Sequence, residues 1–300
     1  MVVPLAMLLL LATACQPKEA PAPRTTAVAG DFECPPISTT PSAGDEIVRG
    51  AIAVRLCPSE SDGPLSLSTV TSLQAPPDAL TTHVDQLLDT FDVLPVVADD
   101  AVRQCPGSGG TNYLLTFQYD DGRLRTVRAS LGGCGDVLAG DGARTGAKEL
   151  LLAFRAQLWS QREDSATPEV SVPLVCPADD AHDAVVTSPV ARPEEVSRAV
   201  VCTHPDGRRG YRPAQELTRS EVRQLGSDLA GEADTSQDFG TCADPLLTTI
   251  VGQTAWGDVF QLLDICTQLL GQGLDGARAW QQSEQTAATI DRLVARALRR

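Results

Sequence analysis

The fold is decided by two stretches, AIAVRLC at residues 51–57 and VSRAVVC at residues 196–202. Each is a short apolar run that ends in cysteine, which is typical of a buried strand fixed by a disulfide bond. Eight of the nine cysteines surround these runs in two successive quartets with similar spacing: Cys34, Cys57, Cys105 and Cys134, then Cys176, Cys202, Cys242 and Cys266. The sequence therefore predicts two tandem copies of one disulfide-bonded module, in residues 34–165 and 166–300.

Short motifs beside the cysteines agree with a duplication. Both quartets open with Cys-Pro, and both copies carry Pro-x-x-x-Leu-Thr, at residues 76–81 and 213–218. In the second copy Thr218 and Glu221 have the spacing of a capping box, so this motif is expected to open an amphipathic helix. Asp-Gly-Ala-Arg, at residues 141–144 and 275–278, precedes the closing helix predicted for each copy.

A β-hairpin is predicted between the third and fourth cysteines of each copy. Residues 113–119 and 124–131 have strand composition and flank a turn at Asp120-Asp121-Gly122. In the second copy residues 246–251 and 259–265 flank a turn near Gly257. Each copy then reads as strand, helix, hairpin, helix. The expected fold class is α+β, with two tandem modules built on small antiparallel sheets.

The hairpins favour two of the disulfide pairs. Antiparallel strands bring their outer ends together, so Cys105–Cys134 and Cys242–Cys266 are geometrically reasonable bonds. The pairs Cys34–Cys57 and Cys176–Cys202 complete the predicted set. Four cysteines allow three connectivities, and the other pairings within each module stay open.

The N-terminus has the features of an exported lipoprotein. Residues 2–14 are almost wholly apolar but too short for a transmembrane helix. Ala12-Thr13-Ala14-Cys15 resembles a lipobox, in which the cysteine is diacylated and becomes the new N-terminus. We expect residues 1–14 to be a signal peptide, Cys15 to carry the lipid, and the Pro-rich residues 15–33 to be a tether. The protein is then expected on the extracytoplasmic face of the cell membrane.

The chain resembles a group of exported actinobacterial lipoproteins. The features that carry the resemblance are the Cys-Pro openings, the strands that end in cysteine, the hairpins with a glycine turn and Gly132-Gly133-Cys134-Gly135. Residues 131–137 and 250–266 carry it most clearly. The resemblance implies a location in the cell envelope and two disulfide-bonded repeats, and it implies no activity.

The remaining signals argue against several kinds of chemistry. The formal net charge is −15, the acidic excess is spread over both copies and no basic tract occurs, so nucleic acid is not expected as a partner. No Cys-x-x-C occurs, which argues against a zinc ribbon or thiol exchange. His83, His182 and His204 suit helix-surface or turn positions, and Ser108 lacks the histidine arrangement of a serine protease. We expect no catalytic residues, no metal and no cofactor.

These observations favour a lipid-anchored binding or interaction protein of the envelope. Its expected contacts are the membrane, through the anchor, and an envelope protein or a cell-wall ligand. Two alternatives stay open: an envelope hydrolase whose site is built from loops, and an accessory structural lipoprotein. A polar pocket between the modules would favour an enzyme or a ligand-binding protein, whereas an exposed apolar patch would favour a protein partner.

Overall fold

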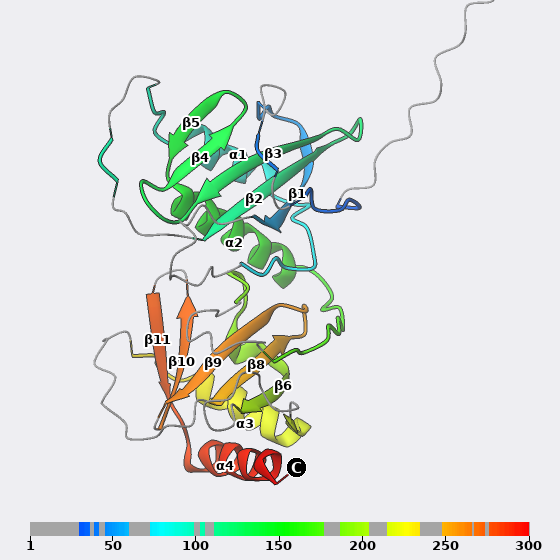
Figure 1. Ribbon diagram of the computed structural model, residues 1–300. Helices are drawn as coiled ribbons and strands as arrows, with labels where there is room; N and C mark the ends of the chain where they lie inside the picture. Colours follow the sequence, from blue (N-terminus) through cyan, green and yellow to red (C-terminus); the bar gives the residue numbers. More distant parts are fainter. Residues whose placement is uncertain are drawn as a thin grey trace, which may run out of the picture.

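The computed structural model describes residues 30–36, 39–41, 46–59, 73–98, 103–105, 111–176, 187–203, 215–234, 248–265, 267–273 and 276–299. Within these residues the chain forms two antiparallel sheets and four α-helices, so the protein is α+β (Figure 1). Residues 30–165 are called the N-terminal half below, and residues 166–299 the C-terminal half. Each half contains one sheet.

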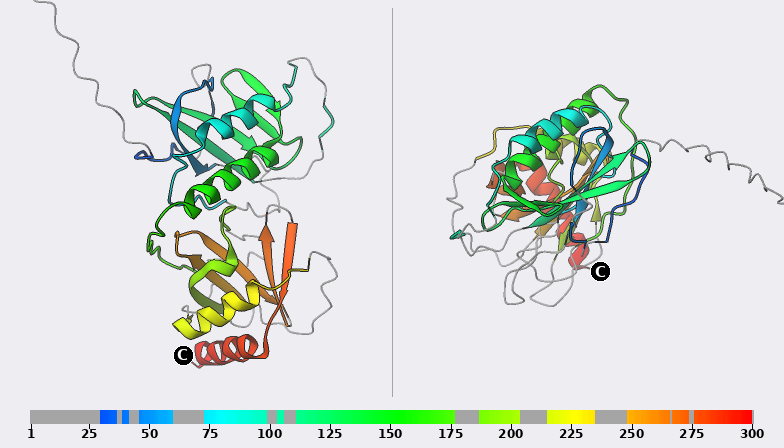
Figure 2. Two further views of the ribbon diagram at one scale, coloured as in Figure 1. Left: turned by 180° about the vertical axis from the view of Figure 1, so that it is seen from behind. Right: turned by 90° about the horizontal axis from the view of Figure 1, so that it is seen from above.

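The N-terminal half is a five-stranded sheet with two helices on one face (Figure 2). Its strands run in the order β1-β2-β3-β4-β5, and each pairs antiparallel with the next. Helix α1 lies in sequence between β1 and β2, and α2 follows β5. The elements are β1 (Ala51–Pro58), α1 (Val84–Val93), β2 (Asn112–Tyr119), β3 (Leu124–Ser130), β4 (Asp136–Ala139), β5 (Gly142–Thr145) and α2 (Ala147–Glu163).

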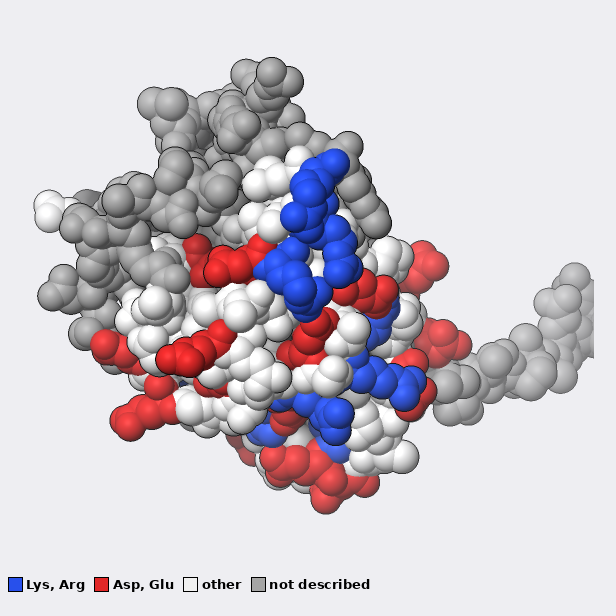
Figure 3. Space-filling view, turned by 90° about the horizontal axis from the view of Figure 1, so that it is seen from below, with Lys and Arg blue, Asp and Glu red and all other residues white. Residues whose placement is uncertain are grey.

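The C-terminal half has a six-stranded sheet in the order β11-β10-β9-β8-β6-β7. Helices α3 and α4 pack on one face of it and form the end of the molecule that faces the viewer in Figure 3. The elements are η2 (Pro193–Glu195), β6 (Val196–Thr203), β7 (Gln215–Glu216), α3 (Arg219–Leu229), β8 (Thr248–Thr254), β9 (Val259–Ile265), β10 (Gln268–Gly273), β11 (Gly276–Gln281) and α4 (Glu284–Leu298).

Each sheet buries an apolar layer under its own helices. In β2, Tyr113, Leu115 and Phe117 are fully buried and belong to the N-terminal core, together with the apolar face of α2. Alternate residues of one strand point to one face of a sheet, which is why these positions share the helix side. The C-terminal core has the same layout, with Val222 and Leu225 of α3 and Ile290 and Leu293 of α4 packed on the sheet.

Helix α3 begins where the sequence predicts. Thr218 is its N-cap residue, and the capping box is complete because Thr218 Oγ1 accepts from Glu221 N–H while the Glu221 carboxylate accepts from Thr218 N–H. Helix α4 buries Ile290 and Leu293, whereas Leu298 in its last turn is 38% exposed. Helix α1 begins at Val84, later than the Leu-Thr motif suggests.

The predicted hairpins are parts of larger meanders. β2 and β3, like β8 and β9, form the expected hairpins, but two more strands follow each of them. Asp-Gly-Ala-Arg precedes the closing helix of each half, α2 and α4, but it is itself part of a strand. Its glycines, Gly142 and Gly276, begin the last strand of each sheet. In the N-terminal half the strands β4 and β5 have four residues each, too short to show a clear alternation of apolar residues.

The pair β1–β2 of the N-terminal sheet and the pair β6–β8 of the C-terminal sheet have the same register. In the pair β1–β2 the register shifts between Ala51 and Ala53, whose partners are Tyr119 and Gln118, and Cys57 pairs with Leu114. In the pair β6–β8 the shift lies between Val196 and Arg198, whose partners are Thr254 and Gln253, and Cys202 pairs with Thr249. The irregularity therefore stands the same number of residues before the cysteine in both strands.

The two hairpin turns also have matching hydrogen bonds. Tyr119 N–H donates to Arg123 O, and Gly122 N–H donates to Tyr119 O. In the C-terminal half Thr254 N–H donates to Asp258 O, and Gly257 N–H donates to Thr254 O. Gly122 and Gly257 have φ of 80° and 87°, a conformation that favours glycine.

Disulfide bonds join three cysteine pairs among the described residues: Cys34–Cys57, Cys105–Cys134 and Cys176–Cys202, with Cα–Cα distances of 5.6, 4.9 and 5.7 Å. The first and third each fix a preceding segment to the first strand of a sheet, on the face opposite the helices. Cys242 and Cys266, the fourth predicted pair, lie outside the described residues.

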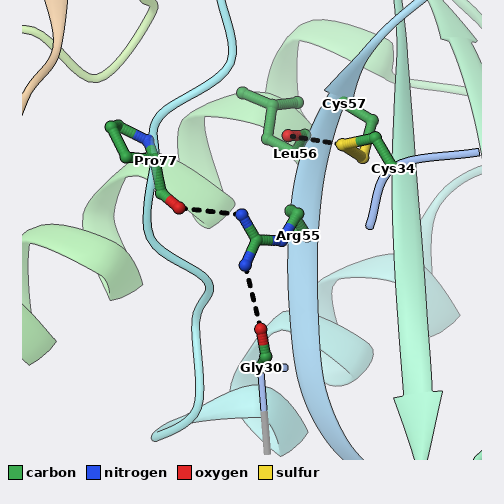
Figure 4. The surroundings of a disulfide bond; sticks show 6 residues. All are labelled: Gly30, Cys34, Arg55, Leu56, Cys57 and Pro77. Carbon is green, nitrogen blue, oxygen red and sulfur yellow. Dashed lines mark hydrogen bonds between the residues drawn. A yellow bond between two sulfur atoms is a disulfide. The ribbon is translucent and has the colours of Figure 1, made fainter. Parts of the chain in front are cut away.

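The segment before Cys34 is packed against the N-terminal sheet. Arg55 of β1 donates to the carbonyls of Gly30 and Pro77, at 2.9 and 2.7 Å (Figure 4). Its guanidinium also lies 5.4 Å from the centre of the Phe32 ring. The last residues of the predicted tether, from Gly30 onward, therefore contact the folded domain.

We predict that peptide mapping without reduction recovers these three disulfides and a fourth, Cys242–Cys266, because the three bonds leave only these two cysteines of the quartets. Breaking Cys34–Cys57 with paired Cys→Ser substitutions is expected to cost about 3 kcal/mol of unfolding free energy, since the bond closes a chain loop in the unfolded state. A peptide that links Cys242 to a cysteine of residues 34–165 would contradict the pairing.

Candidate functional site: a buried arginine between the two halves

Arg162 lies in the last turn of α2, and its side chain is only 7% exposed. A cation near the C-terminus of a helix is favoured by the helix dipole. Burial of a guanidinium nevertheless requires partners for its five N–H donors, because an unpaired buried charge is very costly.

Two carboxylates provide these partners, one from each half of the protein. Asp78, which precedes α1, accepts from Arg162 Nε at 3.0 Å and from Nη2 at 2.7 Å. Asp258, in the turn between β8 and β9, accepts from Nη1 at 2.6 Å and from Nη2 at 3.1 Å. Both pairs are bidentate, the geometry in which a planar guanidinium binds a carboxylate best. Arg162 therefore bridges the N-terminal half to the C-terminal half.

The β8–β9 turn positions Asp258 for this contact. Thr254 Oγ1 and Ser188 Oγ donate to the carboxylate at 3.3 and 3.5 Å, and the Trp256 ring lies 5.0 Å from the Arg162 guanidinium carbon. A Cβ added at Gly257 would stand 2.7 Å from a Val170 side-chain atom and 2.9 Å from Pro77 Cγ. Gly257 is thus required both by its positive φ and by the close approach of the turn to the N-terminal half.

A second set of contacts joins the halves beside Arg162. Val190 belongs to the C-terminal half in sequence, yet its side chain is fully buried in the N-terminal core. Trp159 Nε1, on α2, donates to the Val190 carbonyl at 2.8 Å, and the Arg192 guanidinium carbon lies 4.1 Å from the Trp159 ring centre. The C-terminal half is therefore attached by an apolar anchor as well as by ion pairs.

Burial and charge act in opposite directions on the cluster. Burial disfavours the charged form of Arg162, but hydrogen bonds and charges of Asp78 and Asp258 outweigh it and raise the pKa of the guanidinium. Burial is also the largest influence on Asp258, whose side chain is 1% exposed, and it raises the pKa of that carboxyl although Arg162 acts to lower it. Asp78 is 24% exposed and keeps contact with solvent.

The chemistry of this cluster suits structural linkage better than proton transfer. An arginine stays protonated in proteins, and four of its N–H donor contacts here are made to carboxylates. A guanidinium held in this way has little capacity left for a substrate. The cluster is therefore a site that positions the two halves.

Six of the residues considered from the sequence lie outside the described residues. These are Cys15, Ser108, His182, His204, Cys242 and Cys266. His83 is described and exposed, and it immediately precedes α1 with φ of 58° rather than lying within the helix. Its Nδ1 is 3.3 Å from Gln86 Nε2. In the described part of the chain no group of three or more His, Cys, Asp or Glu side chains could hold a metal ion.

Sequence reasoning missed Arg162, because residues 162–173 are polar and contain Pro168 and Pro173, a composition that predicts a linker between the two copies. Helix α2 instead continues to Glu163. The signal was present: Phe154, Leu158 and Arg162 are spaced by four residues and continue one helix face, and all three are buried. An arginine at the end of an apolar helix stripe was the available sign of a buried ion pair.

Comparison with known proteins found no matching family model, no matching curated protein and no matching solved structure. None of the described helices is long and apolar enough to cross a membrane.

We predict that Arg162→Met lowers the free energy of unfolding by about 3–5 kcal/mol at neutral pH, because it leaves Asp258 charged and buried without its partner. The matched control is Arg123→Met, which removes an exposed ion pair with Asp121 and should cost under about 1 kcal/mol. Urea unfolding of the three proteins measures both effects.

The pH dependence of the same variant follows from Asp258, whose pKa is raised by burial and lowered by Arg162, so that removing Arg162 raises this pKa further in the folded variant. A carboxyl whose pKa is raised by folding binds its proton more tightly in the folded state, so lowering the pH toward that pKa stabilises the fold at this position. The deficit of Arg162→Met relative to the wild type should therefore shrink between pH 7 and pH values near 4. A deficit that stays constant or grows over this range would contradict a buried, unpaired carboxylate.

Proposed function

We propose that this protein is a lipid-anchored binding protein of the bacterial cell envelope, built from two copies of one module in which a strand, a helix, a four-stranded meander and a second helix follow one another. The main support for a binding role is the buried contact between Arg162, Asp78 and Asp258. It makes the two halves one scaffold, which presents a surface of fixed shape to a partner. Preorganisation of this kind lowers the entropic cost of binding.

Three features support a duplication. The register shift stands at the same distance before Cys57 and Cys202. The hairpin turns share their hydrogen bonds and their positive-φ glycine. The two Pro-x-x-x-Leu-Thr motifs place Leu80 and Leu217 at matching positions, because the N–H of each donates to the residue three before the strand cysteine, Val54 and Ala199 respectively.

Export is supported by the disulfides and by the leader sequence. Three disulfides in one chain are typical of an oxidising compartment. The apolar residues 2–14, the small residues before Cys15 and the following Pro-rich stretch fit a lipoprotein signal. Two or three acyl chains on Cys15 would hold the protein firmly on the outer face of the membrane.

We predict that Cys15 carries the lipid and that residues 1–14 are removed. Cells that express the protein should incorporate an alkyne fatty acid into it, and the Cys15→Ala variant should lose the label and the membrane association. Cys34→Ser, at a disulfide cysteine, serves as a control and should keep the label. Full labelling of Cys15→Ala would contradict the anchor.

The binding role is tested by cross-linking in intact cells followed by affinity purification and mass spectrometry. The wild type should retain a specific envelope partner, and Arg162→Met should retain much less of it at equal abundance, because the halves are no longer held in one arrangement. The control Arg123→Met should behave as the wild type. Retention of the same partner by Arg162→Met at the wild-type level would contradict the proposal that the joined halves form the binding surface.

A further inference from the structure

Four arginine side chains stand apart from all other basic residues that the structure describes. Each of the other described arginines and lysines has a hydrogen bond, an ion pair or a ring contact. The four without such a partner among the described residues are Arg219, Arg223, Arg296 and Arg299, and all four are exposed. All lie on or directly after α3 or α4. In a protein with a net charge of −15 this concentration is unexpected.

The two helices bring these arginines to the same end of their layer. Asp228, near the end of α3, accepts from the N–H and Oγ of Ser283, which caps α4. Glu221, near the start of α3, makes an ion pair with Arg292 of α4. The helices are therefore antiparallel neighbours, and the start of α3 lies beside the later turns of α4. We call Arg219, Arg223, Arg292, Arg296 and Arg299 the arginine end.

Helix stability explains only part of this arrangement. Arg296, in the last turn of α4, interacts favourably with the helix dipole, and Arg299 directly follows the helix. Arg219 is the first residue of α3, where the dipole favours acidic rather than basic side chains. Its position is unfavourable for the helix and it has no anionic partner among the described residues. A cation placed in this way is available to an anionic ligand.

The shape of the charged surface suggests a narrow ligand. Figure 3 looks onto the helix end of the molecule and shows basic side chains gathered in a column with acidic side chains on either side. Arg292 and Arg296 of α4, and Arg299 directly after it, follow one another at helical spacing. A flat anionic membrane would also meet the exposed acids Glu232 and Glu284 at the other end of this layer. A slender chain can contact the arginines without reaching these two acids.

The location also favours a ligand other than the anchoring membrane. The described chain begins at Gly30, which is held by Arg55 in the N-terminal half. The α3–α4 layer lies at the far end of the C-terminal half (Figures 1 and 2). An anchor at Cys15 would attach to the half that lacks the arginine end.

We propose that the arginine end binds a slender anionic polymer of the envelope, whose charges are phosphates or carboxylates. Arginine binds both groups through paired N–H donors. This inference rests on the binding role proposed above, and it names a class of ligand for one part of that surface, the part that the C-terminal half provides. Binding at the arginine end does not depend on the lipid, so polymer binding and lipid anchoring can be tested separately.

The test uses the full-length chain with Cys15→Ser as a common, non-acylated background. Linear polyphosphate and poly-L-glutamate are the two polymer probes, and they separate phosphate from carboxylate recognition. We expect binding to at least one of them that weakens steeply with added salt. Arg296→Gln with Arg299→Gln should weaken it at least tenfold at low salt, and Arg219→Gln with Arg223→Gln should act in the same direction.

The matched control is Arg49→Gln with Arg123→Gln, which removes the same charge from two exposed, ion-paired arginines of the N-terminal half. It should leave the affinity within about twofold of the background, because screening confines the effect to charges within roughly a Debye length of the ligand.

An equal loss in the control, or no binding of either polymer, would overturn the proposal. Binding to phosphatidylglycerol vesicles that depends on Arg296 and Arg299, without binding to the polymers, would assign the surface to a membrane and also overturn it. If the protein binds neither polymer but still retains an envelope partner in the cross-linking experiment, the polymer site at the arginine end is refuted and the proposed binding role is not.

Discussion

The guanidinium of Arg162, held between Asp78 and Asp258, is the contact on which the arrangement of the two halves depends. Each half has its own sheet, helices and apolar core. The ion pairs and Val190 set where one half stands relative to the other. A buried ion pair contributes little net stability compared with a well-packed apolar contact, but its loss is costly and its geometry is strict. It is therefore better suited to fix an orientation than to stabilise a core.

Local sequence signals predicted much of the fold. The strands ending at Cys57 and Cys202, the two hairpins and the capped helix α3 each rest on neighbouring residues, and the α+β class follows from them. The third and fourth strands of each meander were not predicted. β4 and β5 have four residues each, so they show no clear alternation, and their pairing is set by the sheet beside them rather than by their own composition.

The candidate site was less accessible to sequence reasoning, because its three charged residues come from distant parts of the chain. Asp78 and Asp258 stand in turns where aspartate is ordinary, and only Arg162 continued an apolar stripe. The arginine end was hidden for a related reason. No basic tract exists in the sequence, and two antiparallel helices bring the separate arginines to one end. The interactions among the described residues, which leave four arginines unpartnered, revealed it.

Differential scanning calorimetry of the wild type and Arg162→Met tests the central claim most directly. If Arg162 joins the halves into one cooperative unit, the wild type unfolds in a single transition whose calorimetric and van't Hoff enthalpies agree. The variant should then unfold in two transitions, one for each sheet with its helices. Two separate transitions already present in the wild type, or an unchanged single transition in Arg162→Met, would contradict the account.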